Sequence, residues 1–224
     1  TNIVCSGGFM KDRKSNVLSL LEDKTNDFAN KVALGIKTGY GWKEFTYNGL
    51  GVTSRKLASY LINDLELSRG EKLAILSESK PEYGACVFAS IIAGLITVPL
   101  DIKLTKYELK SILSDCLPSV MLVSQHYVEM ALALQKELPS IKQIIVMDEP
   151  SYNQTLPSIY TIPNNYNCKW RHRSKKSTLF IIYTSGTTGS PKGVEISFGN
   201  MLSQLEDLKY ALDSALNQTY KNIE

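Results

Sequence analysis

The feature that most constrains the fold is a regular alternation of short apolar runs with segments of helical period between residues 72 and 147. The apolar runs cover residues 72–76, 96–100, 120–123 and 143–147. Apolar runs of this length that alternate with helices are typical of buried parallel strands joined by right-handed crossovers. The pattern therefore predicts an α/β fold with a largely parallel, doubly wound sheet and flanking helices.

Local signals place the helices of this alternation. Pro81 suits the first turn of a helix that carries Tyr83, Val87 and Ile91, because its missing N–H has no partner there in any case. Thr105 and Glu108 have the T-x-x-E spacing of a capping box. Residues 127–138 form the next predicted helix.

Upstream of this region, the sequence predicts a hairpin followed by a helix. Residues 32–36 and 42–47 are strand-like and flank Gly39-Tyr40-Gly41, whose glycines supply the positive φ that a tight reversal needs. The predicted helix then carries leucines on one face, namely Leu50, Leu57, Leu61 and Leu65.

Composition excludes several classes of protein. The 224 residues are enough for one large domain, and 43% hydrophobic residues are too many for global disorder. A net charge of +3 is small for a protein that neutralises nucleic-acid phosphates, so no nucleic-acid partner is expected. The four cysteines share no C-x-x-C spacing and are expected to be reduced thiols; they are Cys5, Cys86, Cys116 and Cys168.

One uncharged stretch, residues 83–100, reaches the lower length limit of a membrane-spanning helix. Gly94 and Pro99 interrupt it, and its second half is better explained as a buried strand. We therefore expect no transmembrane span, although peripheral membrane contact stays compatible with the sequence. The first ten residues lack the pattern of a secretory signal, which favours a cytoplasmic location.

The alternation ends at residue 147. Residues 148–176 are rich in Pro, Asn and Tyr, and this is long for a plain connection. We expect an α/β region over residues 1–147, an irregular connection over 148–176, and a hairpin with a following helix of the same subdomain over 177–224. The basic run at 169–173 is interpreted as a solvated loop.

The strongest functional signal lies at residues 183–194, where an apolar run leads into Tyr-Thr-Ser-Gly-Thr-Thr-Gly-Ser-Pro-Lys-Gly-Val. Glycines let backbone N–H groups approach an anion, hydroxyls can donate to its oxygens, and a lysine supplies positive charge. The segment therefore predicts a phosphate site made of Thr184, Ser185, Gly186, Thr187, Thr188, Gly189 and Lys192.

This loop differs from a Walker A loop, which needs Gly before its lysine and Ser or Thr after it. Here Pro191 precedes Lys192 and Gly193 follows it. Residues 194–197 then alternate apolar and polar side chains as a strand does. The loop is therefore expected to connect two strands as a hairpin, and to bind phosphate without a helix dipole.

Residues 183–194 resemble the signature loop of the AMP-forming adenylating enzymes, which include acyl-CoA synthetases, fatty-acyl-AMP ligases, luciferases and adenylation domains of peptide synthetases. The resemblance extends to Phe45-Thr46-Tyr47 and to residues 69–76 and 93–100. Residues 77–83 and 99–101 are most similar to the long-chain fatty acid branch of the family.

The resemblance implies a two-step reaction. A carboxylate attacks the α-phosphorus of Mg²⁺-bound ATP to give an acyl-adenylate and pyrophosphate, and coenzyme A then displaces AMP. The loop would hold the β- and γ-phosphates. Two alternatives stay open: a fatty-acyl-AMP ligase that transfers to an acyl carrier protein, and a non-catalytic homologue that binds nucleotide.

Departures from the family pattern limit what can be carried over. Phe198 stands where members commonly have His, and Lys175-Lys176-Ser177 replaces acidic residues. The family's later motifs for adenine, ribose, metal and the mobile C-terminal domain do not occur before Glu224. We therefore expect the N-terminal portion of a longer enzyme, inactive alone, with no certain catalytic residue and no metal ligand in these residues.

Overall fold

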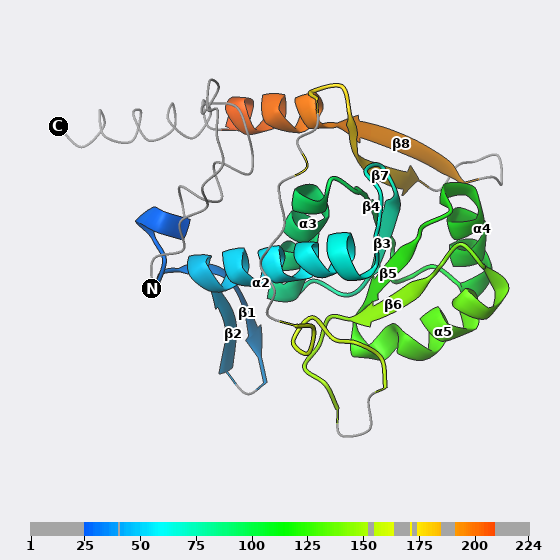
Figure 1. The fold of residues 1–224 in the computed structure, drawn as a ribbon, viewed down its shortest axis with the longest axis horizontal. Helices are drawn as coiled ribbons and strands as arrows, with labels where there is room; N and C mark the ends of the chain where they lie inside the picture. Colours follow the sequence, from blue (N-terminus) through cyan, green and yellow to red (C-terminus); the bar gives the residue numbers. More distant parts are fainter. Residues whose placement is uncertain are drawn as a thin grey trace.

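The central feature of the structure is a six-stranded sheet with the order β6-β5-β3-β4-β7-β8 (Figure 1). The structure is a computed structural model, which describes residues 25–39, 41–151, 155–163, 171, 174–184 and 191–208. The strands are β3 (Lys72–Leu76), β4 (Ile96–Pro99), β5 (Val120–Val123), β6 (Gln143–Val146), β7 (Thr178–Thr184) and β8 (Lys192–Ser197). All neighbours pair in parallel except β7 and β8, which are antiparallel. The predicted α/β fold with a largely parallel sheet is confirmed.

Helices cover both faces of the sheet. They are α2 (Tyr47–Ser59), which continues as the π-helical turn η1 (Tyr60–Asp64), α3 (Pro81–Ala93), α4 (Lys106–Cys116) and α5 (Val128–Glu137), which follows the short 3₁₀ turn η2 (Gln125–Tyr127). Residues 198–208 are also helical. None of the described helices is long and apolar enough to cross a membrane.

The two faces of β3 belong to two different cores. Leu73 and Ile75 are fully buried in a cluster that includes residues of α2 and α3. Ala74 and Leu76, which alternate with them, are fully buried in a second cluster with residues of α4 and α5. Strand side chains alternate between faces, so a continuous apolar run is the sequence expected of a strand covered on both sides.

The predicted local signals at the helix starts are confirmed. Thr105 and Glu108 form a reciprocal capping box at α4, and Pro81 occupies the first turn of α3. Thr46 caps α2 by accepting a hydrogen bond from the Gly49 N–H at 3.1 Å. The two threonine side chains each accept from a backbone N–H group that the first helical turn leaves without a partner.

The predicted N-terminal hairpin is also confirmed, as β1 (Val32–Thr38) and β2 (Gly41–Thr46), which pair antiparallel. Gly41 has a φ of 122°, a conformation that side chains disfavour, whereas Gly39 does not have the predicted positive φ. The hairpin packs on α3, where a Cβ at Gly84 would lie 2.4 Å from Leu34 Cδ1. Gly84 thus permits this close approach.

The buried face of α3 agrees with the predicted one at Ile91, which is 4% exposed, and differs from it at two other positions. Tyr83 and Val87 are half-buried, whereas the fully buried face carries small side chains, among them Ala85, Cys86 and Ala89. Because α3 packs against α2, β1 and β2 as well as the sheet, small residues are needed where the backbones approach. Periodicity of large apolar residues does not detect such a face.

The residue that ends α3, Gly94, can be tested for its requirement for glycine. It adopts a left-handed conformation with a φ of 71°, and a Cβ there would lie 3.0 Å from Arg171 Cβ. We expect Gly94→Ala to lower the free energy of unfolding by about 1–2 kcal/mol, as measured by urea denaturation. Gly39→Ala is the control, because a Cβ at Gly39 meets nothing within 4 Å. Equal losses in the two variants would contradict the explanation.

Candidate functional site

The predicted phosphate loop joins β7 to β8. The two strands pair antiparallel, with Thr184 opposite Lys192 as the last pair before the loop. The predicted hairpin connection is therefore confirmed, and the structure brings these two predicted site residues together. Both are exposed to solvent. The other predicted site residues, Ser185, Gly186, Thr187, Thr188 and Gly189, lie outside the described residues.

The pair next to Thr184 and Lys192 is Tyr183 and Gly193. A Cβ at Gly193 would lie 2.8 Å from Ile181 Cγ2 and 3.2 Å from Tyr183 Cζ. The Tyr183 ring therefore occupies space over the Gly193 backbone. Its hydroxyl donates a hydrogen bond to the carboxylate of Asp115 on α4. Burial and this hydrogen bond raise the pKa of Tyr183, so the hydroxyl stays protonated.

The residues after β8 show what replaces the family's common histidine. Phe198 is 9% exposed and belongs to the same core as Leu179 of β7. Its N–H donates to the Ser177 carbonyl at 2.9 Å, and the Gly199 N–H donates to the Lys175 carbonyl at 2.8 Å. Phe198 thus contributes core packing, and residues 175–177 contact the start of the helix at 198–208 through their backbone.

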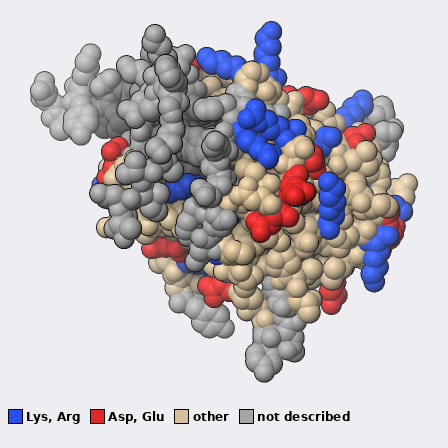
Figure 2. All heavy atoms as spheres, in the orientation of Figure 1, with Lys and Arg blue, Asp and Glu red and all other residues tan. Residues whose placement is uncertain are grey.

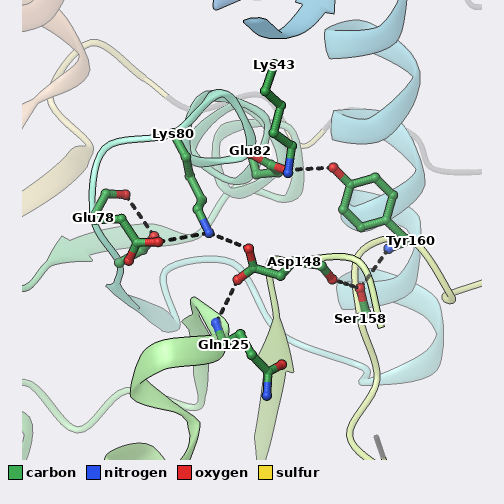
Figure 3. A network of polar contacts seen from close by, with 9 residues as sticks. Lys43, Glu78, Lys80, Glu82, Gln125, Asp148, Ser158 and Tyr160 are labelled. Carbon is green, nitrogen blue, oxygen red and sulfur yellow. Dashed lines mark hydrogen bonds and ion pairs between the residues drawn. The ribbon is translucent and has the colours of Figure 1, made fainter. Parts of the chain in front are cut away.

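A second polar arrangement, which the sequence analysis did not predict, lies at the carboxyl ends of β3, β5 and β6 (Figure 3). Lys80 Nζ lies 3.0 Å from a Glu78 oxygen and 2.5 Å from an Asp148 oxygen. The Ser124 hydroxyl donates to Glu78 at 2.6 Å, and the Gln125 N–H donates to Asp148 at 2.6 Å. The contacts therefore connect the loops that follow three strands.

In this network, the hydrogen bonds and ion pairs outweigh the effect of burial on the pKa values. Burial alone would raise the pKa of Glu78, but the hydrogen bond from Ser124 and the ion pair with Lys80 lower it below its usual value. Burial would lower the pKa of Lys80, but the contacts with Asp148 and Glu78 raise it. Both groups therefore stay charged at neutral pH and are paired with each other.

Glu82 extends the network to the N-terminal hairpin (Figure 3). Its side chain is fully buried, forms an ion pair with Lys43 of β2 and accepts a 2.7 Å hydrogen bond from the Tyr160 hydroxyl. Burial and that hydrogen bond raise the pKa of Tyr160. The Tyr160 N–H donates to Ser158 Oγ, which in turn donates to the Asp148 carbonyl at 2.5 Å. Residues 155–163 are thereby held against α3.

Part of this network could have been predicted from where its residues stand in the sequence. Glu78, Ser124 and Asp148 each follow directly or closely after an apolar run, and the carboxyl ends of parallel strands meet at one edge. Their charges and hydrogen bonds are directed at one another, so we interpret the network as support for the fold. The β7–β8 hairpin lies at the other edge of the sheet, away from β6 and β5.

Surface charge is mixed on the face shown in Figure 2, where basic and acidic side chains of the described residues are interspersed. This distribution agrees with the small net charge of +3. Interspersed charges produce a weaker long-range field than a patch of one sign.

Comparison with known proteins gives matches over most of the chain. The family model for AMP-binding enzymes matches residues 21–221. A hybrid PKS-NRPS synthetase from Acremonium sp is 30% identical over 178 residues, which cover 80% of this chain and 4% of that protein. The mouse (Mus musculus) long-chain-fatty-acid–CoA ligase ACSBG1 is 26% identical over 205 residues, which cover 86% of this chain and 28% of the ligase.

Solved structures agree with these matches. An anthranilate CoA ligase in complex with anthranoyl-AMP superposes with a TM-score of 0.70 at 25% identity, over 82% of this chain and 35% of the ligase. A candidate long-chain-fatty-acid CoA ligase from Rhodopseudomonas palustris gives a TM-score of 0.75 at 22% identity, over 86% of this chain and 47% of that one. The latter shows the fold alone. The chain therefore spans less than half the length of these relatives.

The buried Glu82 carboxylate provides a test of the polar network. Tyr160→Phe removes the hydroxyl donor, and Glu82 Oε2 already has no hydrogen-bond partner among the described residues. We expect the free energy of unfolding to fall by about 1.5–3 kcal/mol in urea denaturation, because a buried charged group loses a hydrogen bond. Tyr107→Phe, at an 82% exposed position, is the matched control and should leave stability unchanged. If both variants behave alike, Tyr160 does not support the fold in this way.

Proposed function

Because the chain belongs to the AMP-binding enzyme family, we propose that the protein containing it activates a carboxylic acid with ATP and then transfers the acyl group to a thiol. In the first step, a carboxylate oxygen bonds to the α-phosphorus of ATP while the bond to the bridging oxygen breaks. The products are an acyl-adenylate and pyrophosphate. In the second step, the thiol sulfur attacks the acyl carbon and AMP leaves.

The observation that carries this proposal is the β7–β8 hairpin, which presents Thr184 opposite Lys192 at the entrance to the glycine-rich loop. In the proposed site, the Lys192 ammonium and the hydroxyls of Thr184, Ser185, Thr187 and Thr188 bind the β- and γ-phosphates. Backbone N–H groups at Gly186 and Gly189 add donors. These contacts would orient pyrophosphate as the leaving group and stabilise the charge that accumulates on it.

Magnesium would accompany ATP in this reaction as a Lewis acid on the phosphates. Among the described residues, no three or more His, Cys, Asp or Glu side chains lie together in a way that could hold a metal ion.

The proposed acid is a long-chain fatty acid, and the proposed thiol is coenzyme A. The similarity to the mouse long-chain-fatty-acid–CoA ligase supports both choices. A carrier-protein thiol is the second candidate acceptor, because a hybrid PKS-NRPS synthetase matches at 30% identity. A cytoplasmic location belongs to the same proposal, as does the alternative of a nucleotide-binding homologue without turnover.

The overall reaction can be tested on the full-length protein. We expect fatty-acid-dependent exchange of pyrophosphate into ATP, and formation of acyl-CoA when coenzyme A is supplied. Exchange with transfer only to an acyl carrier protein would favour the second acceptor. ATP binding by calorimetry without exchange for any carboxylic acid would instead indicate a non-catalytic homologue.

Lys192 provides the sharper test of the loop. In the full-length protein, Lys192→Ala should lower kcat/KM for adenylate formation by about 10- to 150-fold, equivalent to about 1.5–3 kcal/mol, because one charge-assisted contact to phosphate is lost. Lys176→Ala is the matched control, since Lys176 is an exposed lysine in the turn before β7. Unchanged kinetics in Lys192→Ala would show that this lysine does not bind the phosphates.

A further inference from the structure

The residues beside the phosphate loop form an anchor that neither the motif nor the family match assigns. We propose that Asp115 is a positioning residue for the loop, acting through the Tyr183 hydroxyl to hold Thr184 and Lys192 in place. The proposal rests on the proposed function, because it concerns how the same loop is positioned for the phosphates of ATP.

The first observation is the location of Tyr183. It immediately precedes Thr184, and its Cα partner Gly193 immediately follows Lys192. One cross-strand pair therefore flanks both ends of the loop. A Cβ at Gly193 would lie 3.2 Å and 3.4 Å from the Cζ and Cε1 atoms of the Tyr183 ring. An aromatic ring that covers a cross-strand glycine in this way protects its backbone and restricts sliding of the two strands.

The second observation is what holds the ring. The Tyr183 hydroxyl donates to the carboxylate of Asp115, which is the penultimate residue of α4. The following residue, Cys116, is 3% exposed in the core that also contains Leu113 and Ile181. The acceptor thus belongs to a helix fixed by packing, close to the end of the hairpin (Figure 1).

The chemistry of the contact makes Asp115 the effective acceptor. Burial raises the pKa of the neighbouring Cys116 thiol to about 11, so this thiol stays neutral near pH 7. A carboxylate that accepts from a phenol forms a charge-assisted hydrogen bond, which is shorter and stronger than one between neutral groups. Asp115 therefore accepts the hydrogen bond that fixes the orientation of the Tyr183 ring.

The third observation is that the opposite face of the hairpin lacks comparable support among the described residues. Ile182 and Val194 are Cα partners there, and they are 39% and 52% exposed. On the neighbouring side of the sheet, β4 pairs with β7 at Thr97 and Phe180, before the last residues of β7. The end of the hairpin thus depends on the Tyr183 side for its position, and a phosphate site tolerates little displacement of its donors.

The test uses the full-length protein with Asp115→Ala, Asp115→Asn, Tyr183→Phe and the Asp115→Ala/Tyr183→Phe double variant. Tyr107→Phe is the matched control, because Tyr107 is an 82% exposed tyrosine on the same helix. The measurements are the dissociation constant for ATP by calorimetry, the KM values for ATP and for the carboxylic acid, and the melting temperature. Tyr183→Phe keeps the ring over Gly193 and removes only the hydroxyl.

We expect Asp115→Ala and Tyr183→Phe each to weaken ATP binding about tenfold, which corresponds to about 1.4 kcal/mol, with the KM for the acid unchanged. The double variant should bind ATP no more weakly than either single variant, because the two single variants and the double variant all remove the same hydrogen bond. Asp115→Asn should keep most of the affinity, since its amide oxygen still accepts the hydrogen bond. A purely structural role would instead lower the melting temperature and leave the affinity for ATP unaltered.

The outcomes separate this proposal from the proposed function. ATP binding that is unchanged in both single variants overturns the positioning role, even if the wild type catalyses exchange. A wild type that binds ATP but shows no acid-dependent exchange overturns the proposed function, and the affinities of the variants still decide the role of Asp115. A wild type that binds no ATP overturns both.

Discussion

The structure depends on the burial of a parallel sheet from both sides at once. β3 lies between β5 and β4, and its residues contribute alternately to two separate cores. Each of Leu73, Ala74, Ile75 and Leu76 is fully buried, so the strand cannot have a solvent face. This constraint requires helices on both faces, and it explains why β3, β4 and β5 are each followed by a helix that leads to another strand of the sheet.

Polar side chains that come shortly after the buried strands pair with one another. At the carboxyl ends of β3 and β6, Lys80 forms ion pairs with Glu78 and Asp148. The same network reaches Glu82 and Tyr160, and so connects the N-terminal hairpin, α3 and residues 155–163. A buried carboxylate such as Glu82 is stable only with donors of this kind, which makes the three segments depend on one another.

The signature loop lies at the antiparallel end of the sheet, where these constraints are weaker. β7 joins the sheet through β4, and β8 pairs with β7. The residues at the two ends of the loop are held by the contacts of Tyr183 with Gly193 and Asp115, which link them to α4.

The sequence by itself determined the features that depend on neighbouring residues: the buried strands, the capping box of Thr105 and Glu108, the start of α3 at Pro81 and the hairpin form of the loop. It also indicated the family, through an unusually long motif. Only the tertiary structure decided the order of the strands, the buried face of small residues on α3, and the side-chain pairs that join distant positions. Lys80 and Asp148 are 68 residues apart, as are Tyr183 and Asp115, and Glu82 and Tyr160 are 78 apart. No local pattern specifies such pairs, because their geometry follows from how helices and strands pack on the sheet.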